Sequence, residues 1–230
     1  MKILQRIEIN NGNDSSRSIL FGIPDSANEM KEMFRLRYDS YLENGYIESN
    51  EAKLDQDKYD NLPDTYYVLA KMEGQAVGTA RIIKQHPLPT IRDCFELDEP
   101  QVMRETSPTT HGEISRLIAR YPYNYKLPPH TILVGLLDAL DLLAEIANVD
   151  RGYCFVKKTL FQKFNNLNIK VHLIENYKLK YSDSYLHNYF YNSANPVYPI
   201  YYTKEEIRNS LKDINQRIKQ HGLDLIQYDT

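Results

Sequence analysis

The sequence predicts an α/β domain in which a mixed β-sheet is flanked by helices, and three observations lead to this prediction. Two β-rich runs flank the turn MEGQ within residues 65–85, which is the pattern of an antiparallel hairpin. Further β-rich stretches at 113–119, 152–158 and 169–177 alternate with helical patterns, an order typical of parallel crossovers. The 230 residues, of which 42% are hydrophobic and 26% charged, have the composition of one folded domain, alone or with an extension.

The elements before residue 112 each have their own signal. A helix is expected over 27–46, where apolar and aromatic residues recur every three or four positions. Ser26 is suited to its N-cap and Gly45 to its C-terminal end. Residues 51–64 are polar and rich in turn formers, which indicates a loop, and residues 86–111 are expected to be irregular.

The strand at 113–119 is followed by the turn segment RYPYNYKLPP and then by an apolar-rich helix over 130–147. The run GYCFVKK at 152–158 is short and continuously apolar at its centre, which predicts a buried strand. A short helix in TLFQKFNNLN and a strand at 169–177 complete the predicted sheet.

The remainder of the chain differs in composition. Residues 178–230 are rich in Tyr and Asn and close with the charged amphipathic helix TKEEIRNSLKDINQRIKQHG, in which Thr203 and Glu206 form a capping box. We therefore expect a domain at 1–177 and a C-terminal extension at 178–230 that packs on the same domain.

Bulk properties exclude several classes of protein. A net charge of −3 and a sequence pI near 6.1 argue against a nucleic-acid-binding protein, which would carry a basic excess. The N-terminal MKILQRIEIN lacks the apolar region of a secretory signal, and the longest apolar stretch, ILVGLLDALDLLAEIA, is too short and too charged to span a bilayer. Cys94 and Cys154 are isolated, without metal-ligand spacing, so we expect a cytoplasmic protein with no bound metal.

The stretch HGEISRLIAR places two charges in a predicted core strand. In a regular strand Glu113 and Arg116 face opposite sides, so they can act together only if the strand contains an extra residue. A β-bulge would supply that residue and leave a backbone N–H unpaired, which could polarise a substrate carbonyl. We expect this donor at Leu117 or Ile118.

Four short motifs follow one another along the chain: FRLRYDSYLENGY, DKYD, GTARI and GEISRL. Their charged and aromatic residues of interest are Arg37, Tyr41, Asp57, Asp60, Arg81, Glu113 and Arg116. The order of elements resembles the GNAT acyltransferase fold, and the motifs are similar to those of the acyl-homoserine-lactone (autoinducer) synthases and the related N-acyl amino acid synthases. The resemblance covers roughly residues 27–176.

Two departures from these families bear on the substrates. Homoserine-lactone synthases carry a tryptophan shortly after the first helix, near their S-adenosylmethionine pocket, whereas this chain has no Trp and Tyr46 stands about there. The Gly-rich pyrophosphate loop of ordinary GNAT enzymes is also absent, and YPYNYKLPP follows the strand instead. The resemblance therefore favours acyl carrier protein over coenzyme A as the acyl donor, with no permanently bound cofactor.

Acyl transfer to an amine requires a base, because an amino acid's amine is mostly protonated at neutral pH. Glu113 is the first candidate and Asp57 the second, since a carboxylate can accept this proton when its surroundings tune its pKa. Arg37, Arg81 and Arg116 would neutralise the acidic cluster and position either the loop or a substrate carboxylate, which a forked guanidinium group can bind at two places at once.

The remaining candidate residues are grouped by role. Substrate contacts are expected from Tyr41, Tyr46 and Asp60, together with the arginines and the strand residues named above. One face of the 130–147 helix would supply an acyl pocket from Leu133, Leu136, Leu137 and Leu140. An acidic carrier protein would dock on Lys157, Lys158, Lys163 and Lys170.

Each of these readings has a structural alternative. Glu113 and Arg116 could form a structural ion pair, Asp57 and Asp60 could be ordinary turn formers, and the four leucines could be core residues first. Three functions therefore compete: an N-acyltransferase acting on an amino acid or similar amine, a homoserine-lactone synthase using S-adenosylmethionine, and a GNAT-like protein that binds without turnover. The joint presence of all the motif residues speaks against the third, and the missing Trp against the second.

Overall fold

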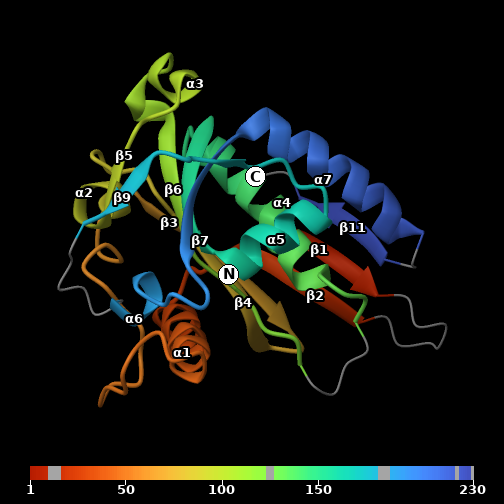
Figure 1. The fold of residues 1–230 in the computed structure, drawn as a ribbon. Helices are drawn as coiled ribbons and strands as arrows, with labels where there is room; N and C mark the ends of the chain where they lie inside the picture. The colour runs from red at the N-terminus through yellow and green to blue at the C-terminus, as the bar shows by residue number, and fades with distance from the viewer. Residues whose placement is uncertain (10–16, 123–126, 181–186, 221–222, 229–230) are drawn as a thin grey trace.

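A mixed β-sheet forms the centre of the molecule in the computed structural model, which describes residues 1–9, 17–122, 127–180, 187–220 and 223–228 (Figure 1). Over these residues the sheet has nine strands in the order β11-β1-β2-β3-β4-β6-β7-β10-β8. Their bounds are β1 Lys2–Ile9, β2 Arg17–Ile23, β3 Thr65–Met72, β4 Gln75–Ile83, β6 His111–Ala119, β7 Arg151–Lys157, β8 His172–Leu173, β10 Val197–Thr203 and β11 Leu223–Gln227. Every described neighbouring pair is antiparallel except β6 and β7, which are parallel. The predicted mixed sheet is thus confirmed.

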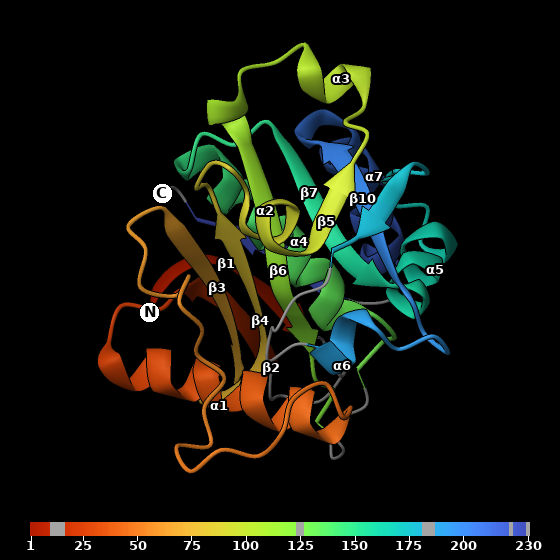
Figure 2. The same cartoon turned by 60° about the vertical axis from the view of Figure 1, so that its left-hand side comes forward.

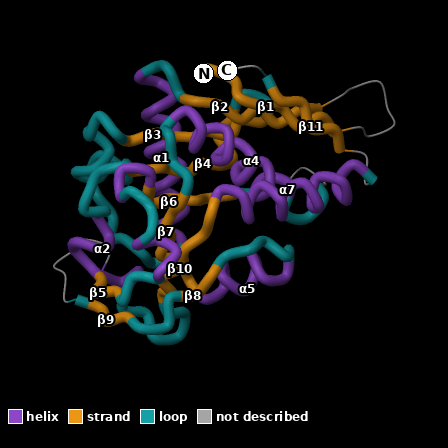
Figure 3. The backbone as a smooth tube through the Cα atoms, turned by 90° about the horizontal axis from the view of Figure 1, so that it is seen from above, coloured by secondary structure: helices purple, strands orange, loops and turns teal. Residues whose placement is uncertain are grey.

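Helices cover both faces of this sheet. The longer ones are α1 Ala27–Glu43, α4 Thr131–Ile146, α5 Lys158–Asn166 and α7 Lys204–Lys219; the short ones are α2 Pro89–Cys94, α3 Gln101–Arg104, η1 Pro108–Thr110 and α6 His187–Phe190. Figure 2 shows α1 and α2 in front of the sheet with α4 and α7 behind it, and Figure 3 shows the same two sides from above. The main apolar core lies between the sheet and α4, and a smaller one lies under α1.

Most predicted elements are confirmed, with ends within a few residues of the expected ones. Ser26 caps α1 by accepting a hydrogen bond from the Glu29 amide at 3.2 Å. The hairpin is β3 and β4, with Gly74 at φ +79° in its turn, a left-handed conformation that costs a glycine little. The turn segment after β6 lies partly outside the described residues, since 123–126 are not among them.

The prediction of one strand over 169–177 is wrong. Only His172–Leu173 pair with the main sheet, as β8, and β9 Tyr177–Leu179 pairs with β5 Phe95–Leu97 in a separate two-stranded sheet. Between them Glu175 and Asn176 are exposed, and the Asn176 carbonyl accepts a hydrogen bond from the Asp98 amide at 3.0 Å. The apolar run therefore bends away from the edge of the main sheet instead of extending it.

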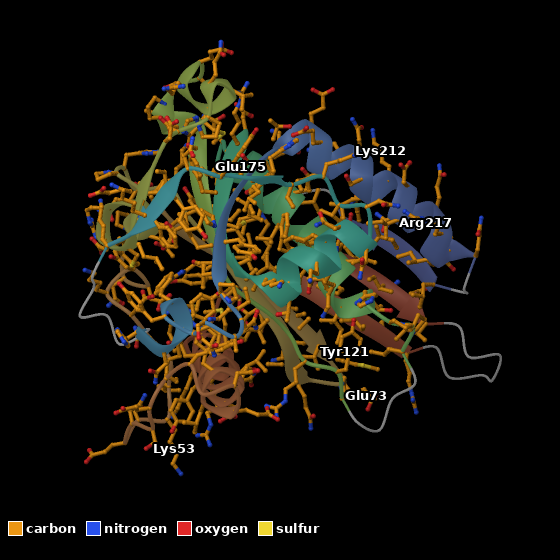
Figure 4. The ribbon with its side chains drawn as sticks, in the orientation of Figure 1. Lys53, Glu73, Tyr121, Glu175, Lys212 and Arg217 are labelled. Atoms are coloured by element: carbon orange, nitrogen blue, oxygen red, sulfur yellow. The ribbon has the colours of Figure 1, made fainter. Side chains whose placement is uncertain are left out.

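The C-terminal part of the chain contributes directly to the sheet. Strand β10 lies between β7 and β8, and β11 pairs with β1 at the opposite edge. Helix α7 packs on α4 and begins with the predicted capping box of Thr203 and Glu206. Lys212 and Arg217 project from α7 into solvent on the side away from α4 (Figure 4). No helix in the described parts of the chain is both long and apolar enough to cross a membrane.

The contact between α4 and α7 contains a buried carboxyl group. Asp138 is 5% exposed and accepts a hydrogen bond from the Asn215 amide nitrogen at 3.0 Å. Its Oδ2 atom and the Oδ1 atom of Asn215 are both buried without a hydrogen-bond donor among the described residues. A proton on the Asp138 carboxyl would supply one donor, and burial together with the nearby charge of Asp141 raises the pKa of Asp138 to about 7.

This carboxyl should make folding stability depend on pH. Because its folded-state pKa lies above the ordinary value, the folded chain holds one more proton than the unfolded chain between about pH 4 and pH 7. The free energy of unfolding should therefore fall by up to about 1.4 kcal/mol per pH unit as pH rises through that interval. Asp138→Asn should remove this component and be more stable than the unsubstituted chain at pH 8, as measured by urea unfolding across a pH series. Asp213→Asn, an exposed change on α7, is the matched control, and parallel pH slopes in both variants would contradict the assignment.

Candidate active site

The two parallel strands of the sheet separate along their length. Strands β6 and β7 are paired only where His111–Ile114 face Arg151–Cys154, although β6 continues to Ala119 and β7 to Lys157. Beyond Ile114 the strands leave a gap in the sheet. Two cavities of the described molecule are lined by residues of this gap.

Strand β6 contains the predicted bulge at this point. Against β4, Ser115 pairs with Arg81 and Ile118 pairs with Thr79, so Arg116 and Leu117 together oppose the single residue Ala80. Arg116 adopts φ +55°, a left-handed conformation that is unfavourable for a residue with a side chain. The bulge is thus confirmed, while the free amide expected at Leu117 or Ile118 stays a prediction.

A closed ring of buried ion pairs lies beside the bulge. In order around the ring its members are Arg37, Asp55, Arg116, Asp57, Arg81 and Asp60. Arg37 donates to Asp55 at 2.7 Å and to both carboxylate oxygens of Asp60 at 2.9 Å. Arg116 donates to Asp55 at 2.8 Å and to Asp57 at 2.9 Å. Arg81 closes the ring with bonds of 2.8 Å to Asp57 and Asp60.

The ring joins α1, the 51–64 loop, β4 and β6, and its three positive and three negative charges cancel. Burial alone would favour neutral carboxyl groups, but the neighbouring guanidinium groups outweigh it and hold the pKa values of Asp55 and Asp60 below their ordinary range. The expectation that the three arginines bind a substrate carboxylate is therefore not supported by this geometry, because each guanidinium already binds two aspartates. The three arginines instead neutralise the three aspartates. The bonds of Asp55 and Asp57 to Arg116 hold that residue in its left-handed conformation.

Glu113 stands apart from this ring. Its side chain is 2% exposed and accepts two hydrogen bonds from Thr90 of α2, at 2.9 Å from the amide and 2.6 Å from the hydroxyl. Burial raises the pKa of Glu113 despite these two bonds. Among the described residues Glu113 and Arg116 form no ion pair with each other, so the structural-pair alternative is wrong.

The two cavities at the strand gap differ in character. The larger, about 630 Å³, is bordered by charged and polar side chains that include Asp57, Arg81 and Glu113. The smaller, about 210 Å³, is mainly apolar and runs beneath α4 and α5. Six residues line both cavities and so mark where they meet: Tyr41, Ile114, Ser115, Arg116, Phe155 and Tyr189.

Three tyrosines pack together at this meeting point. Tyr41 lies edge-to-face with Tyr46 at a centroid distance of 5.8 Å and parallel to Tyr189 at 6.4 Å. The Arg116 guanidinium lies 5.2 Å from the centre of the Tyr41 ring. Tyr41 and Tyr46 thus lie at the cavities as expected, with Tyr46 on the apolar side only.

Two of the four leucines predicted to form the acyl pocket border the apolar cavity. Leu137 and Leu140 of α4 border the apolar cavity, as does Leu117 of β6. Leu133 and Leu136 are buried in the main core instead, where the side chain of Leu136 packs closely against Gly78. Ile118 points into a separate cluster with Leu36 and Tyr38 under α1. Leu133, Leu137 and Leu140 share one face of α4, so the division among the four leucines follows position along the helix. The residues of α4 that border the apolar cavity, Leu137, Leu140, Asp141 and Ala144, all come after Leu136.

Of the four lysines proposed for docking, three lie at the surface. Lys158, Lys163 and Lys170 are exposed on α5 and just after it. Lys157 is only 4% exposed and lies between Tyr46 and Tyr189, so its assignment to a docking surface is wrong. Lys157 ends β7, whose last six residues are all buried, whereas Lys158 begins α5 and is exposed.

The sequence analysis missed three residues of the site. Asp55 precedes Asp57 by two positions in the same acidic loop, and this repetition was the available signal. Thr90 and Tyr189 lie in segments without regular periodicity, so no local pattern indicated them. Tyr189 comes from α6, in the C-terminal extension proposed from the sequence.

Several solved structures of other proteins share this fold. The AHL synthase LasI matches with a TM-score of 0.63 and 15% identity, covering 85% of this chain and 95% of that one. FeeM, an N-acyl amino acid synthase from uncultured soil microbes, matches with a TM-score of 0.57 and 15% identity over 84% and 94% of the two chains. The CoA-dependent acyl-homoserine lactone synthase MesI matches with a TM-score of 0.56 and 16% identity over 80% and 87%. The fold is that of the GNAT-like acyltransferases.

Comparison of the sequence with protein families identifies the family of this chain. The family described as N-acyl amino acid synthase FeeM matches residues 32–164, which is more than half of the chain and includes the whole ion-pair ring and Glu113. The chain belongs to this family and is an acyltransferase. No match was found among the curated proteins.

Proposed function

We propose that this protein moves a fatty acyl group from the thiol of an acyl carrier protein to the amine of an amino acid or a similar small amine. The observation that carries the proposal is the meeting of an apolar and a polar cavity at the gap between β6 and β7. An enzyme that joins a fatty acyl group to a small amine needs both kinds of cavity, since the acyl chain is a hydrocarbon and the amine is a small polar molecule. The family to which the chain belongs supports the choice of an amino acid as acceptor.

The chemistry follows from the residues at the two cavities. The acyl chain lies along Leu117, Leu137 and Leu140, and the thioester carbonyl accepts a hydrogen bond from the backbone amide at the bulge. The acceptor amine enters the polar cavity, where Glu113 takes its proton directly or through a water molecule. Asp57 is less suited to this role, because Arg81 and Arg116 both donate hydrogen bonds to it.

A thiol-release assay tests the proposal. The protein is incubated with acyl carrier protein or coenzyme A thioesters and a panel of amino acids together with S-adenosylmethionine, and the products are identified by mass spectrometry. The expected product is an N-acyl amino acid. A lactone product formed only with S-adenosylmethionine would instead identify a homoserine-lactone synthase, and no thiol release with any acceptor would contradict the proposal.

Carrier-protein docking should depend on salt. Lys158 and Lys163 are exposed on α5, which borders the apolar cavity through Leu160 and Phe164. Attraction to an acidic carrier mainly raises the association rate and is screened over roughly 8 Å at physiological ionic strength. We expect the carrier KM to rise roughly tenfold with added salt and Lys158→Glu/Lys163→Glu to reproduce this rise at low salt, with little change in kcat.

The control for this experiment is Lys212→Glu, which makes the same charge change on the exposed face of α7. Lys170→Glu extends the test to the third exposed lysine. Equal efficiency with acyl-coenzyme A, combined with salt-independent carrier kinetics, would exclude acyl carrier protein as the preferred donor.

A further inference from the structure

Lys157 is a buried amine at the gap between the two parallel strands. It is the last residue of β7, is 4% exposed, and lines the apolar cavity. Its ammonium nitrogen lies 4.4 Å from the centre of the Tyr189 ring and 5.2 Å from that of Tyr46, and it donates a hydrogen bond to the backbone carbonyl of Tyr189. The side chain is therefore fixed in place within the wall of the cavity.

Among the residues that the structure describes, no carboxylate pairs with this amine. The described residues that form ion pairs do not include Lys157, and only burial shifts its pKa, which it lowers to about 8. The groups that face the amine are the phenols of Tyr46 and Tyr189, whose pKa values burial raises, so neither carries charge near neutral pH. A buried lysine without an acid is costly to folding, which indicates a chemical reason for its presence.

Lys157 lies next to the place where the acyl donor must react. If the acyl chain occupies the apolar cavity and the amine the polar one, the reacting carbonyl lies where the six shared residues meet. Tyr189 is one of those six, and Lys157 is bound to it by a hydrogen bond and lies against its ring. Of these two cavities, Lys157 lines the apolar one and Glu113 the polar one, so the two groups approach the reacting carbonyl from different sides.

We propose that Lys157 is the general acid that protonates the departing thiolate of the acyl donor. This inference rests on the proposed thioester donor. It divides proton transfer between two residues: Glu113 receives the proton of the attacking amine, and Lys157 gives one to the leaving sulfur.

The step balances in atoms and electrons. The amine nitrogen forms a bond to the thioester carbonyl carbon while Glu113 takes a proton from it. The carbon–sulfur bond then breaks with its electron pair on sulfur, and the Lys157 ammonium transfers a proton to that sulfur. The products are an amide and a free thiol, after which Glu113 releases its proton to solvent and Lys157 regains one. An ammonium with a pKa near that of a thiol, about 8.5, is well matched to this transfer.

Two substitutions separate proton donation from charge and packing. Lys157→Met keeps the apolar stem but removes the amine, and Lys157→Arg keeps the positive charge but cannot release a proton near neutral pH. Each variant is assayed with two pantetheine-sized donors that carry the same acyl chain. One is an alkyl thioester, whose thiolate needs a proton, and the other is an aryl thioester, whose more acidic thiol leaves without one.

We expect both variants to lose about 100-fold in kcat with the alkyl thioester and less than about fivefold with the aryl thioester. Lys212→Met, an exposed lysine on α7, should behave like the unsubstituted protein with both donors. Equal losses with the two donors would overturn the role of Lys157, because a lysine that only packs or binds would affect both alike.

A measurement on the unsubstituted protein covers the case in which the variants do not fold. With saturating acceptor, kcat for the alkyl thioester should fall above about pH 8, as Lys157 loses its proton, while kcat for the aryl thioester should not. The same alkaline decrease with both donors would contradict the inference. Failure of the unsubstituted protein to release thiol from any thioester would contradict the proposed function itself, which separates the two outcomes.

Discussion

Glu113→Gln should lower kcat by about 10²- to 10⁴-fold while leaving the free energy of unfolding nearly unchanged. The glutamine keeps the shape of the side chain and can keep both contacts to Thr90, because its amide can donate to the threonine hydroxyl while its carbonyl accepts from the backbone amide. What it loses is the ability to accept the proton of the attacking amine. The measurements are steady-state thiol release and urea unfolding of the same preparation.

The pH dependence of the reaction provides an independent test of the same residue. Burial raises the pKa of Glu113, so kcat should increase with pH over a range that lies above the ordinary glutamate pKa. This ascending limb of the pH profile should be absent in Glu113→Gln. Thr90→Val should move this limb to higher pH, since the lost hydroxyl bond stabilises the ionised carboxylate. Unchanged turnover in Glu113→Gln would exclude Glu113 as the base and favour Asp57.

Asp55→Asn should destabilise the fold by about 3–5 kcal/mol, the cost of leaving buried charges unpaired. Asp55 has no exposed side-chain surface and accepts hydrogen bonds from Arg37 and Arg116, so its loss leaves three arginines against two aspartates. Asp39→Asn breaks an exposed pair with Arg35 on the surface of α1 and should cost less than about 1 kcal/mol. Urea unfolding of both variants gives the comparison.

The ring should also set the acid limit of stability. The folded-state pKa values of Asp55 and Asp60 are lowered, so their contribution is present above the ordinary aspartate pKa of about 3.9 and is lost as pH falls through the folded-state values. Asp55→Asn should weaken this acid dependence. A loss of stability below about 1 kcal/mol in Asp55→Asn, with unchanged acid unfolding, would contradict a stabilising role for the ring.

Local sequence patterns were sufficient to predict several helices and strands of this protein. Four signals each depend on residues close together in sequence, and each was predicted correctly. They are the recurrence of apolar residues every three or four positions in α1, the apolar-rich stretch of α4, the β-rich runs of β3 and β4 on either side of their turn, and the capping box of α7. The bulge was also predictable, because two charges three residues apart in a core strand require an irregularity to face the same site. The order of the charged motifs was sufficient to indicate the family.

Long-range pairing decided the rest. Strand β1 pairs with β11 from the opposite end of the chain, and β10 pairs with β7 and β8; nothing within each of these segments specifies its distant partner. The closed ring of ion pairs could not be predicted from the sequence either. Arg37 and Arg116 lie far apart in sequence and are brought together in the fold, where both bind Asp55. The inward position of Lys157 depended on Tyr46 and Tyr189 covering the same gap in the sheet. Burial, charge balance and cavity shape are properties of residues brought together from many segments, so only the tertiary structure could decide them.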